Sequence, residues 1–349
     1  MADDRTVIQN RMLVNIPDEY DKSEGEFFYD NTKAVAIELE GAYQDQEAIS
    51  DRGFVETATG EWLDKKVAEQ GLVRKPATKA TCTVTITGSQ GAAVNTGIMV
   101  ASDAVNFIVK ESKVIDATGI VNVLVECEEY GSIGNVPVGA IKYFPVTIAG
   151  LSTVTNPAAA FNGYDGETDE ELRVRYFEKV RTPATSGNKY HYRNWAKEVV
   201  GVGDARVFPL ANGPGTVKVV IIDSNKTGAE PELVTDVFNH IEEVRPIGAT
   251  VEVVSATEVP INVSATLIID ADNYIMNQVI ANIEGKLAEY FKVIAFNATI
   301  TYVSHAVIGS IILDTDGVLD YSNLTINGEA ANIPITDVQV VVLGVVTNV

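Results

Sequence analysis

The sequence has 349 residues, a length that suits two or three domains. Hydrophobic residues make up 46% and charged residues 21%, so the chain can bury real cores and is not typical of a disordered protein. The formal net charge is −22, from 48 acidic and 26 basic residues. Nucleic acid and anionic membranes repel such a chain, so neither is expected as a general partner.

The N-terminus lacks the basic-then-apolar pattern of a signal peptide, and no apolar run approaches the length of a membrane span. The two cysteines, Cys82 and Cys127, lie in or beside strand-like runs. Two cysteines in a chain of this length do not make a disulfide framework. We therefore expect buried thiols, assembly in a reducing cytoplasm and no membrane insertion.

Residues 1–78 are predicted to be an N-terminal helical region. A 3–4 spacing of side chains indicates one face of a long helix, formed by Val35, Leu39, Ala42, Gln46 and Ile49. Trp62, Leu63 and Val67 indicate a shorter helix that Gly71 ends.

Residues 79–160 are predicted to be a small β-rich domain. Thr81–Thr87 alternates β-branched residues, and glycines separate it from further runs. The expected strands that follow are Asn106–Lys110, Val121–Glu126 and Ile141–Thr147.

Residues 161–203 return to helical spacing. Thr168 and Glu171 form a capping box, in which each side chain can bond the backbone amide of the other. Leu172, Tyr176 and Val180 then line one helix face, which Pro183 interrupts. Thr185–Asn188 is the next start signal, for a helix whose apolar face holds Tyr192, Trp195 and Val199.

Residues 204–349 alternate strand and helix. Strands are expected at Arg206–Leu210, Val217–Ile222, Val251–Val254, Ile261–Ile269, Leu319–Ile326 and Val338–Leu343. Helices are expected after Pro231, at Met276–Phe291 and around Tyr302–Leu313. The predicted fold class is α+β and multidomain: a helical N-terminus, a small β domain, a helical linker and a C-terminal sandwich of helices on mixed sheets.

No pattern of residues predicts catalysis, a cofactor or a metal. His191, His240 and His305 are far apart, and no HxxxH, CxxC, GxSxG or phosphate-loop spacing occurs. The acidic cluster at Asp165–Glu171 fits a calcium loop only in part, whereas acids in a first helical turn favour the helix dipole. We interpret it as a helix start.

A set of short motifs in order gives a specific resemblance. These are Glu167–Arg173, Thr185–Asn188, Val199–Gly203, Gly213–Val217 and Arg245–Ala249, with Gly134–Val136 and Thr155–Pro157 upstream. Together they resemble the Baseplate J-like family of phage tail proteins. The resemblance implies a non-enzymatic wedge subunit of the baseplate of a contractile tail or tail-like bacteriocin, passing the contraction trigger to the sheath.

The resemblance also implies partners: a second copy in the wedge, a lysozyme-like wedge protein, a small wedge subunit, the central hub and spike and, indirectly, the sheath. Residues 165–200 carry no net charge in an acidic chain, and arginine and tyrosine are favoured at interfaces. The interface candidates are Arg173, Arg175, Lys179, Arg181, Tyr190, Tyr192 and Arg193. A tail-associated cell-wall hydrolase and a tip adhesin are the alternative functions.

Overall fold

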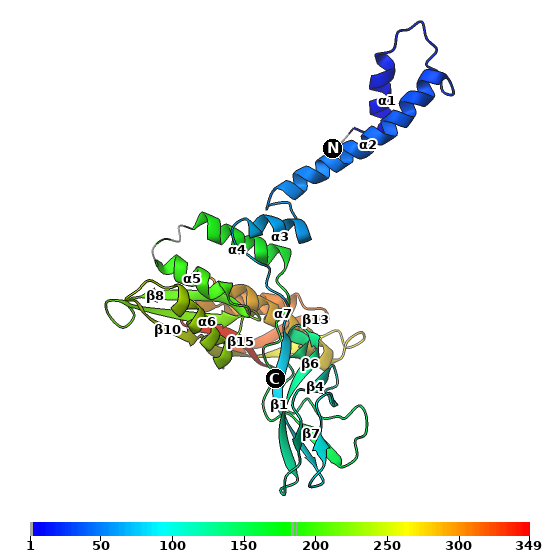
Figure 1. The fold of residues 1–349 in the computed structure, drawn as a ribbon. Helices are drawn as coiled ribbons and strands as arrows, with labels where there is room; N and C mark the ends of the chain where they lie inside the picture. Colours follow the sequence, from blue (N-terminus) through cyan, green and yellow to red (C-terminus); the bar gives the residue numbers. More distant parts are fainter. Residues whose placement is uncertain (1–2, 183–184, 186) are drawn as a thin grey trace. The chain divides into compact units, whose positions relative to one another are not determined.

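The computed structural model describes residues 3–182, 185 and 187–349. The chain forms two units, one of Met1–Arg74 with Glu167–Arg181 and one of Lys75–Gly166 with Thr182–Val349. Helices dominate the first unit, and mixed sheets with helices make up the second (Figure 1). This confirms the α+β multidomain fold class. Pro183 and Ser186, part of the predicted break and restart of the helices, lie outside the described residues.

The first unit begins with a helical hairpin. Helix α1 (Arg5–Val14) starts at Asp4, whose carboxylate accepts the amide of Val7, and it packs on α2 (Phe27–Gly53). The predicted long helix is confirmed. Its apolar face, however, stays largely exposed, because Ala36 is the one residue of α2 that is buried in the described chain.

A small apolar core joins α3 (Gly60–Ala68) to α4 (Asp169–Arg181), and the short helix predicted around Trp62 is confirmed. Its buried members are Val55, Ala58, Leu63, Val67, Leu72 and Leu172, with Tyr176 and Phe177 packed against them. Val180 was predicted on the same face as Leu172, but it is 43% exposed. The buried face of α4 instead includes Arg175.

The second unit opens with a barrel-like sheet. Its strands are β1 (Lys79–Gly88), β2 (Ala93–Val94), β3 (Met99–Ala101), β4 (Asn106–Val109), β5 (Lys113–Val114), β6 (Ile120–Tyr130) and β7 (Leu151–Thr155). Five of them pair in the order β3-β4-β6-β1-β7, and a 3-10 turn (Ser132–Gly134) follows β6. The predicted strands at Thr81–Thr87, Asn106–Lys110 and Val121–Glu126 are confirmed.

The strand predicted at Ile141–Thr147 is wrong. This stretch makes one isolated bridge, between Tyr143 and Ala101, and Val146 is 68% exposed. Pro145 has no amide hydrogen to give to a ladder, so a strand there would lose a hydrogen bond. The edge beside β1 is filled by β7 instead.

Both cysteines lie inside the barrel as free, buried thiols, as expected. Burial raises the pKa of Cys82 to about 12, and it also raises the pKa of Cys127. A thiol that stays protonated at neutral pH is a poor nucleophile. These residues therefore act as small apolar core side chains.

A central α/β layer follows. Strands β8 (Val202–Pro209), β9 (Thr216–Asp223) and β10 (Thr250–Ser255) pair in the order β10-β9-β8, covered by α5 (Lys189–Glu198) and α6 (Pro231–Val244). Antiparallel β8 and β9 form a hairpin, whereas α6 connects β9 to parallel β10. Gly213 and Gly215 have φ of 102° and 82°, and a Cβ at Gly203 would collide with the Asp223 carbonyl. These glycines are therefore backbone requirements.

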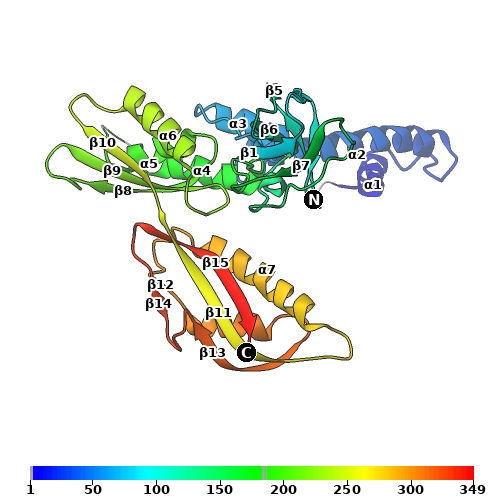
Figure 2. The ribbon, with the colours of Figure 1, turned by 90° about the horizontal axis from the view of Figure 1, so that it is seen from below.

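The C-terminal layer has three main strands in the order β13-β11-β15, where β11 is Thr257–Ile269, β13 is Val318–Ile326 and β15 is Gln339–Asn348. Helices α7 (Met276–Ile294) and α8 (His305–Leu313) pack on this sheet, beside the short pair β12 (Tyr302–Val303) and β14 (Ile333–Pro334). Figure 2 shows α7 alongside β15 and β11. The strand predicted at Ile261–Ile269 is confirmed, and its residues from Ile261 to Leu267 alternate between buried and more exposed positions.

The last strand of the central layer leads almost directly into the first strand of the C-terminal layer. Only Ala256 separates β10 from β11. Arg206 on β8 reaches across to Asp337 at 2.8 Å and to the carbonyl of Asn297 at 3.0 Å. None of the helices in the described part of the chain has the length and apolarity needed to cross a membrane.

Candidate functional site: the charge-balanced segment at helix α4

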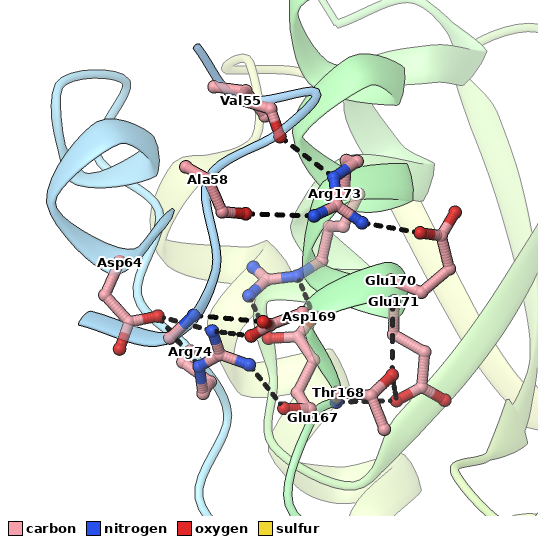
Figure 3. A network of polar contacts seen from close by, with 12 residues as sticks. Val55, Ala58, Asp64, Arg74, Glu167, Thr168, Asp169, Glu170, Glu171 and Arg173 are labelled. Atoms are coloured by element: carbon pink, nitrogen blue, oxygen red, sulfur yellow. Dashed lines mark hydrogen bonds and ion pairs between the residues drawn. The ribbon is translucent and has the colours of Figure 1, made fainter. Parts of the chain in front are cut away.

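Helix α4 starts where the acidic cluster predicts it. The Thr168 hydroxyl accepts the Glu171 amide at 3.3 Å, and the Glu171 carboxylate accepts the Thr168 amide at 2.9 Å (Figure 3). This reciprocal pair is the predicted capping box. The acids of the cluster are each bonded to a protein donor, and the helix start that the sequence predicts is confirmed.

Arg173 faces the polypeptide that precedes α3. Its guanidinium donates to the carbonyl of Val55 at 2.9 Å and to the carbonyl of Ala58 at 3.0 Å, and it pairs with Glu170 at 2.6 Å (Figure 3). The side chain is 17% exposed. Val55 and Ala58 lie between α2 and α3, where a carbonyl has no helical hydrogen bond, and Arg173 supplies the donors for both carbonyls.

Arg175 is the most deeply buried cation of the network. It donates two hydrogen bonds to Glu167, both at 2.6 Å, and a third to the carbonyl of Val73 at 2.7 Å. The side chains of Arg175 and Glu167 are 9% and 7% exposed. A bidentate pair with little water access fixes the orientation of both groups. Arg175 thus ties α4 to the segment after α3.

Arg74 is the third member, and the motif search did not identify it. It bonds Asp64 at 2.8 Å, Asp169 at 2.6 Å and the carbonyl of Glu167 at 2.9 Å. Burial disfavours its charge, yet the two carboxylates raise the pKa of Arg74. The amide of Gly60 and then the Arg74 guanidinium lower the pKa of Asp169. We call Arg74, Arg173 and Arg175 with their carboxylates the arginine network.

The remaining interface candidates on α4 are more accessible. Lys179 is half-buried, and Arg181 is 67% exposed, with its guanidinium 3.8 Å from the centroid of the Phe177 ring and 3.9 Å from Glu56. The described residues therefore place the outward-facing cations at the end of α4, whereas Arg173 and Arg175 make their contacts inside the unit.

The candidates on α5 belong to the second unit and also divide by exposure. Tyr192 is 1% exposed in the central core, and Trp195 packs half-buried against it at 5.0 Å between ring centroids. Trp195 and Tyr176, which were predicted on apolar helix faces, each pack against a local core. Arg193 pairs with Asp204 at 2.8 Å, and Tyr190 is 38% exposed.

The three histidines have separate local partners. His191 stacks on Trp195 with 4.6 Å between centroids, His240 lies 2.9 Å from Glu198, and His305 lies 3.0 Å from the carbonyl of Leu324. In residues 3–182, 185 and 187–349, no group of three histidine, cysteine or carboxylate side chains is placed to hold a metal ion.

Comparisons with known proteins agree with this organisation. Residues 83–163 match the family model of the Baseplate J-like protein barrel domain, residues 184–255 the Baseplate J-like central domain, and residues 261–349 the Baseplate J-like protein C-terminal domain.

Individual proteins are similar over the whole chain or half of it. The phage-like element PBSX protein XkdT of Bacillus subtilis is 35% identical over 99% of this chain and 97% of its own. Baseplate protein gp47 of Escherichia phage Mu is 29% identical over 55% of this chain and 57% of its own. A chain of the anti-feeding prophage baseplate aligns over 97% of both chains at 10% identity, with a TM-score of 0.36, which is too distant to support an argument.

Proposed function

This chain belongs to the Baseplate J-like family of phage baseplate proteins, and from that membership we propose that it is a wedge subunit of the baseplate of a contractile tail or tail-like particle. In this role it assembles in the host cytoplasm with a second copy and with other wedge proteins around the central hub. It has a structural role and passes the contraction trigger toward the sheath.

The observation that carries the proposal is the ordered series of family matches. Three models follow one another from residue 83 to residue 349, and the similarity to the Bacillus subtilis phage-like element protein extends over 99% of the chain. The printed name of the phage Mu relative is that of a baseplate protein. We transfer the baseplate role on that basis.

Helix α2 supports an assembly role. It is 27 residues long, about 40 Å at 1.5 Å per residue, and it leaves large apolar side chains open to solvent. Phe27 is 72% exposed, Val35 47% and Ile49 65%. Large apolar surface that a chain leaves uncovered marks a protein contact. We propose that helices of a second copy and of a small wedge subunit cover this face.

Cations at the end of α4 add to this surface. Arg181 and Lys179 lie on the same unit as α2, in a chain whose net charge is −22. Arg181 is the exposed one of the two, and an exposed cation on an acidic protein favours an acidic partner, including the acidic segments of another copy. Among the predicted interface residues, we keep Lys179, Arg181 and Tyr190 as contact candidates for partner subunits.

The test uses the complete particle. Val35→Glu with Ile49→Glu should leave the purified chain folded, because both side chains are exposed, but should prevent its incorporation into baseplates. Ser50→Glu, at another exposed position of α2, is the matched control and should assemble normally. Incorporation is measured by quantitative mass spectrometry of purified particles. A cryo-EM map that places the wild-type chain outside the baseplate would refute the proposal.

A further inference from the structure

One outer face of the barrel carries hydroxyl and aliphatic side chains where β6, β1 and β7 run side by side. The alternate residues of these strands point into the barrel core, which leaves the others outside. In register, Thr85 lies opposite Asn122 on β6 and opposite Thr155 on β7. We call this surface the threonine face: Thr83, Thr85, Thr87, Ile120, Asn122, Leu124, Thr153 and Thr155.

No member of the threonine face is charged, although the chain carries a net charge of −22. Charged side chains at its margin pair with one another: Lys110 with Glu126 at 2.8 Å, and Lys113 with Glu111 at 2.7 Å. Two copies of such an acidic chain repel each other through most of their surface charge. An uncharged face with a balanced margin is where that repulsion is weakest.

The face is also complementary to itself in hydrogen bonding. The Thr87 and Thr153 hydroxyls lie 2.7 Å apart and either can donate, and the Thr85 hydroxyl donates to Asn122 at 2.8 Å. A hydroxyl both donates and accepts, so a layer of threonines can bond to an identical layer. A two-fold contact requires this property, because each patch meets its own copy.

Two aliphatic side chains give the face a reason to be covered. On β6, Ile120 is 42% exposed opposite Thr87, and Leu124 is 43% exposed opposite Thr83. Burying such surface stabilises a contact at about 25 cal/mol per Å² of apolar area. The threonine face thus offers apolar area to bury and hydroxyls that can form hydrogen bonds across a contact. It carries no charged side chain that would lose its water on contact.

We infer that the threonine face packs against the threonine face of a second copy of this chain. The inference rests on the proposed function, in which several copies meet in one baseplate, and it names the surface used. A patch five residues long and three strands wide has an area of roughly 250 Å², at about 3.4 Å per residue and about 4.8 Å between strands. That is well below the ~800 Å² per partner of a standard interface, so the contact is weak between free chains and stronger where other contacts already hold the copies together.

Cross-linking in the particle and in the purified full chain tests the inference. Thr85→Cys puts a reactive thiol at the centre of the face, whereas native Cys82 and Cys127 are buried and should not compete. A short bismaleimide should link Thr85→Cys chains to each other at least tenfold faster than it links Thr235→Cys chains. Thr235 is an exposed threonine on α6, which makes it the matched control. Adding Leu124→Glu should abolish the faster reaction by placing two like charges in contact.

The outcomes separate this inference from the proposed function. Particles that contain the Thr85→Cys chain without a linked dimer, or with Thr85→Cys linked to a different protein, overturn the threonine-face contact and leave the baseplate role intact. Particles that lack the wild-type chain overturn the baseplate role. In that case, rapid cross-linking of the concentrated purified chain still supports the face, and equal rates for Thr85→Cys and Thr235→Cys refute it.

Discussion

Replacing Arg175 with methionine should loosen α4 from the rest of its unit. The substitution keeps a long apolar stem but removes the guanidinium that donates two 2.6 Å hydrogen bonds to Glu167. Because the Glu167 side chain is 7% exposed, its carboxylate would stay in a site with little water and without its bidentate partner. The carbonyl of Val73, on a residue that is 77% exposed, can instead bond to water.

Loss of the bidentate pair sets the size of the effect. Removing one partner of a buried ion pair costs about 3–5 kcal/mol. At about 1.4 kcal/mol per factor of ten, the amides of α4 should exchange with deuterium at least about 100-fold faster. Hydrogen exchange read by mass spectrometry resolves peptides of α4 and α3 separately from those of the barrel. The barrel peptides should keep their wild-type rates.

The double variant Glu167→Met with Arg175→Met tests the reasoning behind that number. Replacing a buried ion pair with apolar side chains of similar volume is often close to neutral. The double variant should therefore recover most of the protection that Arg175→Met loses. If the two variants exchange equally fast, the lost protection does not come from the buried Glu167 carboxylate that loses its bidentate partner, and the reasoning fails.

Three further predictions follow from single contacts. Thr168→Ala removes the hydroxyl half of the capping box and should destabilise the start of α4 by about 1 kcal/mol, seen as faster exchange of the amides at its N-terminal turn. Gly203→Ala places a Cβ against the Asp223 carbonyl and should cost about 1–3 kcal/mol in thermal unfolding of the second unit, whereas Gly213→Asn, in an open turn, should cost less. The folded-state pKa of Asp169 is lowered, so its stabilising contribution is present above its unfolded pKa of about 3.9 and is lost as the pH falls through the folded value. Asp169→Asn should therefore weaken α4 at neutral pH and make the stability of α4 less sensitive to acid.

Local patterns predicted most elements because the deciding interactions are local. The capping box at Thr168 acts over three residues, and the alternation at Ile261–Ile269 reports a strand with one buried face. Pro231 stands at the first turn of α6, where its missing amide hydrogen costs nothing. Such signals depend on neighbours along the chain and can be read without knowing the fold.

The arginine network could not be predicted in the same way. Arg173 bonds the carbonyl of Val55, 118 residues earlier, and Arg74 bonds Asp169, 95 residues later. Spacing indicates that Arg173 and Arg175 are cations on a helix, but not whether they face solvent or another segment. Arg175 is buried and Val180 is exposed on α4, so side-chain hydrophobicity alone would predict the wrong buried face of this helix. Contacts between residues far apart in the sequence decide where the arginines point and which face of α4 is buried.

Helix α2 shows the opposite limitation. The spacing of its apolar residues correctly predicts a helix, yet the described chain does not bury that face. A periodic pattern reports that a face is meant to be covered, and it does not report whether the covering element is in the same chain.

The discontinuous first unit has a consequence for biosynthesis. Gly60, at the start of α3, bonds Asp169, which is made 109 residues later. At about 5–20 residues per second, α3 waits roughly 5–20 s on the ribosome for α4 to be made. During that time the barrel segment can close, and the amide of Thr78 then bonds the carbonyl of Tyr164 at 2.9 Å. Once that hydrogen bond forms, Arg74 and Glu167 each lie within a few residues of the bonded pair Thr78 and Tyr164. The entropy of closing the long loop between α3 and α4 has then already been lost. Closure of the barrel therefore shortens the loop between the two halves of the helical unit, and slow closure of the barrel should delay docking of α4.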